Sequence, residues 1–251
     1  MVFNYIKESE MESKEKIASF IEYHNIIRPI EYPLLGLPLF SGISSIVWLM
    51  FLVFSPNKYF EERVISYIGM FILICCFILG IISRKKCTKL YNTEPGKSLY
   101  CAEILIHSYC VVIALLFMIY FLLIDNELKE AIIIFICGLS IIAITVCITT
   151  IAIKRRIDKG LYLKKQNGNY KVIQFFSSGA SVVVFILLKN IIINNHDINV
   201  SFVISVLLFI PAEIASILVV LYCLKLKYAK DYALEEYLPT RPHPSKYTGW
   251  K

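Results

Sequence analysis

The chain lacks the residue arrangements that catalysis and cofactor binding use. It has no Gly-rich phosphate loop, no HExxH motif and no GxSxG motif. Its histidines are scattered along the chain and do not cluster; they are His24, His107, His196 and His243. We therefore expect a protein that is not an enzyme and that binds no metal or cofactor.

Charge is almost missing from six long apolar stretches. The mean hydropathy of the chain is +0.66, too apolar for a soluble domain of this size. Each stretch has about 20 residues, enough for a helix to cross the ~30 Å hydrocarbon core of a bilayer. The sequence therefore predicts an all-α, polytopic integral membrane protein with a compact bundle of six transmembrane helices, at residues 34–54, 64–83, 104–124, 131–153, 172–193 and 202–224.

Long loops are also missing, which excludes a folded external domain. Between the stretches lie only short outer loops and somewhat longer inner segments, none able to hold its own core. We expect an amphipathic N-terminal segment at residues 1–33, a membrane domain at 34–224 and a tail at 225–251 that contains proline and tyrosine. The N-terminus does not resemble a cleavable signal peptide, so the first apolar stretch is expected to act as the signal.

Lysine and arginine are unevenly divided between the two sides of the predicted bundle. They number 4, 5, 7 and 6 in the four segments of one side, against 2, 1 and 1 on the other. The positive-inside rule then places both termini in the cytoplasm. The net charge of +7 sits beside helix ends, where it matches anionic headgroups, so we expect the lipid bilayer as partner and no nucleic acid. The Ile, Lys, Asn and Tyr bias suggests a bacterial plasma membrane.

The eight cysteines do not predict disulfides or a zinc site. None lies in a predicted outer loop, and their spacings do not match zinc-binding motifs. We expect small, membrane-embedded thiols.

The N-terminal segment carries helical signals. Ser9 and Glu12 match a capping box, and Pro29 would end the helix. Apolar residues recur at helical spacing between them, at Ile17, Phe20, Ile21 and Ile27. This helix could lie on the inner leaflet or on a partner, but its acidic character favours packing beneath the protein's own bundle.

Glu213 is the most informative single residue. It lies near the middle of the sixth stretch, two residues after Pro211, which can kink a helix. A carboxylate at the bilayer centre costs about 2.5–3.5 kcal/mol and should face the bundle interior. It is either a proton or cation site beside a helix break, with His107 within reach of a water bridge, or a protonated acid that hydrogen-bonds between helices. Other polar side chains predicted near this depth are Gln174, Ser177, Ser178, Ser140, Ser44 and Ser45.

Small residues four apart predict close helix packing on three of the stretches. The pairs are Ser41/Ser45, Ser177/Ser181 and Ala212/Ser216. The last pair flanks Glu213.

The C-terminal tail is a candidate docking peptide. Three prolines, at 239, 242 and 244, exclude a helix and favour an extended chain. Tyr247 and Trp250 would be its anchors at the membrane interface, the bundle or another protein.

Two classes of function follow. The first is a membrane protein that acts through protein partners, as a subunit of a secretion, transport or immunity assembly or as a homo-oligomer. The second is a small transporter or channel centred on Glu213. A membrane enzyme ranks last.

Overall fold

The fold is known from a computed structural model that describes residues 2–22, 38–39, 42–50, 60–125, 128–162, 183–187 and 200–238. Every regular element among these residues is a helix. The main elements are α1 (Val2–Glu22), α3 (Phe60–Thr93), α4 (Pro95–Asp125), α5 (Leu128–Asp158), α7 (Val200–Asp231) and the short 3₁₀ helix η1 (Glu235–Tyr237). Residues 42–50 and 183–187 are also helical.

Four helices are long and apolar enough to cross a membrane: α3, α4, α5 and α7. They correspond to the second, third, fourth and sixth predicted stretches, so the predicted all-α class is confirmed and these four stretches form helices suited to a membrane. About half of the first stretch and most of the fifth lie outside the described residues.

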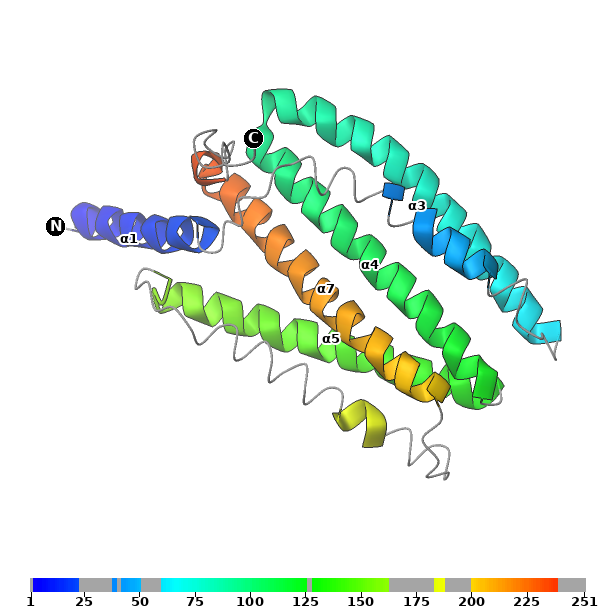
Figure 1. Cartoon of the computed structure of the whole chain (residues 1–251). Coiled ribbons are helices and arrows are strands. Elements are labelled where there is room, and N and C mark those ends of the chain that lie inside the picture. Colours follow the sequence, from blue (N-terminus) through cyan, green and yellow to red (C-terminus); the bar gives the residue numbers. More distant parts are fainter. Residues whose placement is uncertain are drawn as a thin grey trace, which may run out of the picture.

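The central pair of the bundle is α4 and α7, which run antiparallel (Figure 1). α3 packs on α4, and α5 packs on α7. One end of the bundle collects the last turns of α3, α5 and α7 and the first turn of α4. The basic runs at residues 84–86, 154–156 and 225–230 all lie toward this end, which we call the basic end. Within the described part of the chain, these basic runs thus gather at one end of the bundle.

The helices continue beyond the predicted apolar stretches. α3 and α4 replace most of the expected inner segment around residues 84–103, and only Glu94 separates them. Pro95 begins α4, where its missing N–H costs no helical hydrogen bond. The Ser98 hydroxyl donates to the Cys87 carbonyl at 2.6 Å, and Lys97 pairs with Glu94 at 2.7 Å. These contacts fix a tight turn between two antiparallel helices.

Large apolar side chains cover the outward faces of the bundle. Phe71 on α3 is 68% exposed and Ile148 on α5 is 62% exposed. In water such faces would be a liability, whereas in a bilayer they contact acyl chains. All eight cysteines belong to the described helices and are free thiols.

The helical residues 42–50 are held to α3 and α4 by Trp48. The indole N–H donates to the Ser66 carbonyl at 2.9 Å. Its ring lies 5.0 Å from Phe117 and 5.2 Å from Tyr120, between centroids. Gly69 leaves room for the indole, since a Cβ there would overlap the ring.

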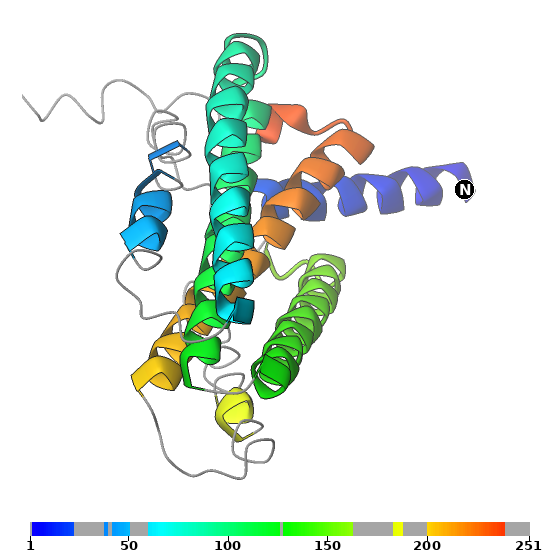
Figure 2. The same cartoon turned by 90° about the vertical axis from the view of Figure 1, so that its right-hand side faces the viewer.

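α1 runs across the direction of the bundle helices at the basic end (Figures 1 and 2). It begins at Val2, so the predicted capping box is wrong: Ser9 and Glu12 lie inside the helix. Glu12 instead pairs with Lys16 at 2.6 Å, and this hydrogen bond and charge lower the pKa of Glu12. The predicted end at Pro29 lies outside the described residues.

The C-terminal half of α1 packs beneath the protein's own bundle, as the sequence favoured. Ile17, Phe20 and Ile21 are buried in one apolar cluster with side chains from α4, α5 and α7. The N-terminal half projects beyond the bundle in both views (Figures 1 and 2).

Candidate functional site

Glu213 is fully buried in the middle of α7, with 0% of its side chain exposed. Its neighbours Phe209 and Ala212 belong to a core cluster that also contains Met118 of α4 and Phe185. The Phe185 and Phe209 rings stack at 4.9 Å. The prediction that Glu213 faces the bundle interior agrees with this burial.

Pro211 does not interrupt α7, which is continuous from Val200 to Asp231. One turn later, the Ser216 hydroxyl donates to the Ala212 carbonyl at 2.7 Å. Transporters place ion sites at broken helices, where free backbone groups coordinate the ion. The described course of α7 offers Glu213 no such break.

The structure does not bring His107 to Glu213. The His107 Nδ1 lies 2.7 Å from the Glu103 carbonyl and 3.6 Å from the Glu103 carboxylate. Its ring packs 5.7 Å from Tyr222, which follows Glu213 by nine residues, ~13 Å of helical rise. Side chains lean toward the N-terminus of their helix, so His107 on α4 leans to the basic end while Glu213 on antiparallel α7 leans away from it.

Other polar residues predicted near Glu213 are found elsewhere or lie outside the described part. Ser140 is exposed and donates to the Ile136 carbonyl of its own helix. Ser44 is buried and Ser45 is partly buried on the helical residues 42–50. The cross-helix contact that sequence reasoning missed is Ser205, whose hydroxyl lies 3.4 Å from the Met118 carbonyl. The remaining candidates lie outside the described residues; they are Gln174, Ser177, Ser178, Ser41, Ser181, Tyr247 and Trp250.

A second buried charged residue on α7, Lys225, was not expected. It belongs to the positive charge that the sequence places beside helix ends, but its side chain is only 1% exposed. The Lys225 ammonium donates to the Ile21 carbonyl at 3.0 Å. Ile21 lies next to Glu22, the last residue of α1 that the structure describes. Lys225 therefore joins the backbone of α1 to the end of α7.

Aromatic rings surround this lysine. Its Nζ lies 5.7 Å from the centre of the Phe20 ring and 5.8 Å from that of Tyr100. The Tyr100 ring in turn lies 5.4 Å from Tyr222. Cation–π contacts of this kind stabilise a desolvated ammonium.

The Lys225 pocket, as we call Lys225, Phe20, Ile21, Tyr100 and Tyr222, continues toward Glu103 and His107. Glu103 is 7% exposed, one turn along α4 from Tyr100. Among the described residues, no three His, Cys, Asp or Glu side chains lie together as metal ligands. These contacts tie α1 to the start of α4 and the end of α7.

Comparison with known proteins adds no assignment. The chain matches no protein-family model, and neither a similar curated protein nor a similar solved structure was found.

Proposed function

We propose that this chain is a non-enzymatic multi-pass membrane protein that acts through a protein partner, as a subunit of a membrane assembly in a bacterial plasma membrane. The supporting observation is α1: its C-terminal half is fixed by the Lys225 pocket, and its N-terminal half projects beyond the bundle. With the positive-inside orientation, this projecting helix lies on the cytoplasmic side.

Burial of the Lys225 ammonium costs free energy that its contacts must offset. Burying an ammonium is expensive unless it is hydrogen-bonded, and the hydrogen bond here joins residues 204 positions apart. A membrane anchor would need no such burial, since lysine at a helix end can extend to the headgroups. Burial of Lys225 against α1 fixes the orientation of that helix. A helix held rigidly at the membrane surface is suited to presenting a docking face.

The exposed residues of α1 fit a polar contact with another protein. Glu12, Ser13, Lys14 and Glu15 are all exposed on the turns just before the buried half. Both signs of charge occur, so the face is less suited to an anionic membrane surface than to a mixed-charge protein surface.

The proposal is tested by purification of the tagged full chain from its native membrane in mild detergent. We expect a second protein at fixed stoichiometry, which is lost when residues 2–15 of α1 are removed. A monodisperse chain without a second protein, or a partner that is retained after this truncation, would contradict the proposal.

The alternative function, a small transporter or channel, is favoured by one observation. Glu213 is a fully buried carboxylate at the middle of an apolar helix. If it carried a proton or cation, Glu213→Gln would abolish coupled flux in vesicles while leaving expression unchanged. If it is a neutral acid within the core, the amide replaces it with little effect.

A further inference from the structure

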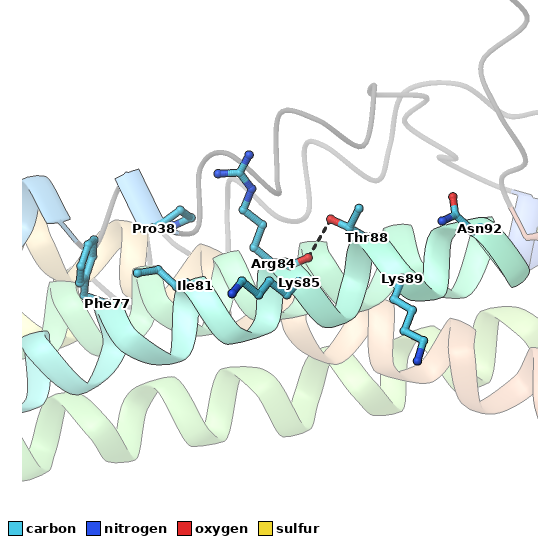
Figure 3. Close-up of a pocket in the computed structure, with 8 residues that line it drawn as sticks. All are labelled: Pro38, Phe77, Ile81, Arg84, Lys85, Thr88, Lys89 and Asn92. Carbon is cyan, nitrogen blue, oxygen red and sulfur yellow. Dashed lines mark hydrogen bonds between the residues drawn. The ribbon is translucent and has the colours of Figure 1, made fainter.

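A cavity of about 620 Å³ lies along the inner half of α3, near the basic end (Figure 3). α3 is at the edge of the bundle, with α4 on its other side (Figure 1). Seven of the eight lining residues come from α3, and Pro38 approaches from an earlier part of the chain. The cavity therefore lies between α3 and the preceding part of the chain, on the side of α3 away from α4.

The lining changes in character along the helix axis. Phe77 and Ile81 form its apolar part, and Arg84 and Lys85 follow within one turn. Thr88, Lys89 and Asn92 continue the lining toward the end of the helix. From Phe77 to Asn92 the helix rises by ~22 Å, so the apolar part lies in the hydrocarbon region when the polar part lies at headgroup level.

The polar side chains can serve a phosphate ester. Among the described residues, the lining includes Arg84 and Lys85 and no carboxylate, and Lys89, also in the lining, points away from Arg84 in Figure 3. In Figure 3 the Arg84 side chain rises from α3 on the same side as Pro38, Thr88 and Asn92. Guanidinium binds phosphate oxygens through two parallel hydrogen bonds, and lysine adds a point charge. The Thr88 hydroxyl already donates to the Arg84 carbonyl at 2.8 Å, so its oxygen remains an acceptor for a headgroup hydroxyl.

We propose that this cavity is a binding site for an anionic phospholipid, with its phosphate at Arg84 and Lys85 and an acyl chain against Phe77 and Ile81. The apolar part of the lining favours a lipid over free phosphate, because an acyl chain contacts Phe77 and Ile81 and free phosphate has no apolar group to do so. The order of the residues also matches the order of groups in a phospholipid, from acyl chain through phosphate to headgroup. A basic pocket at the inner end of a membrane helix is a recognised setting for such lipids.

The test is native mass spectrometry of the full chain in detergent, titrated with dioleoyl phosphatidylglycerol, dioleoyl phosphatidylcholine or water-soluble glycerol phosphate. We expect saturable binding of one phosphatidylglycerol and much weaker binding of the other two. In the double variant Arg84→Gln/Lys85→Gln, phosphatidylglycerol affinity should fall about thirtyfold, from ~1 kcal/mol for each cation near the headgroups.

The matched control is Lys154→Gln/Arg155→Gln, which removes an adjacent pair of exposed cations at the same end of α5. It should change the affinity by less than about twofold, and both double variants should unfold at the wild-type temperature because the positions are exposed. Equal losses in the two variants would show general surface charge and overturn the site. Equal binding of the two lipids would also overturn it, as would displacement of the lipid by equimolar glycerol phosphate.

Discussion

Replacing Lys225 with alanine should release α1 from the bundle without unfolding the membrane helices. The substitution leaves the Ile21 carbonyl without the ammonium that it accepts from at 3.0 Å, and it removes the contacts with the Phe20 and Tyr100 rings. Loss of a buried hydrogen bond from a charged group costs about 1.5–3 kcal/mol. Losing the cation–π contacts with the two rings adds to this cost, whereas no longer burying an ammonium offsets part of it. We take ~2 kcal/mol as the net loss in the free energy that holds α1 on the bundle.

A change of ~2 kcal/mol raises the open population of α1 about thirtyfold, since 1.4 kcal/mol is a factor of ten. Hydrogen–deuterium exchange of the full chain in detergent measures this as faster exchange in a peptide that covers residues 12–22. Exchange in the middle of α4 and α7 should stay at the wild-type rate. Lys227→Ala is the control, because Lys227 is exposed on the same helix two residues later.

Lys225→Met separates hydrogen bonding from packing. Methionine keeps most of the apolar stem but cannot donate to Ile21, so we expect a smaller effect, about fivefold for a loss of ~1 kcal/mol. If exchange in α1 is as slow in Lys225→Met as in the wild type, apolar packing alone holds the helix and the role of the Lys225 hydrogen bond is refuted. Equal effects of the Lys225 and Lys227 substitutions to alanine would refute it as well.

Three further predictions concern the membrane helices. Gly69→Ala should lower the free energy of unfolding by about 1–3 kcal/mol and change the fluorescence of Trp48, because the added methyl overlaps the buried indole. Gly138→Ala has a milder contact and should destabilise the protein less. The reverse order of the two effects would contradict the packing. Glu213→Gln should fold and unfold like the wild type, as judged by yield and melting in detergent, whereas a severe loss of folded protein would mean that the charged form is required. A topology reporter fused at Asn167 should score cytoplasmic, and an external score would overturn the predicted orientation.

The membrane helices were predictable because length and hydropathy decide them locally. A run of about 20 apolar residues forms a helix in a bilayer whatever its neighbours are, since its backbone must be hydrogen-bonded internally. Thus α3, α4, α5 and α7 were each found from their own residues. The sequence did not predict that α3 extends to Thr93 and α7 to Asp231. The apolar pattern ends where a helix leaves the hydrocarbon, whereas the helix itself continues.

The Lys225 pocket could not be predicted because it depends on contacts between distant parts of the chain. Lysine at the inner end of a membrane helix usually lies at the headgroups, and only the docking of Ile21 buries Lys225. A signal was present in the buried half of α1, whose Ile17, Phe20 and Ile21 required an apolar surface. The predicted link between Glu213 and His107 rested on depth alone, whereas the lean of the two side chains along antiparallel helices separates them.

The central claim is that α1 is held in place to contact a protein partner. A photo-crosslinking residue at Glu15, on the exposed face of α1, tests it most directly in intact cells, with Ile148 on the outward face of α5 as the control position. We expect a single crosslinked protein from position 15 and none at stoichiometric yield from position 148. The yield from position 15 should fall several-fold when Lys225 is also changed to alanine. Crosslinking that is equal at the two positions, or unaffected by the loss of Lys225, would contradict it.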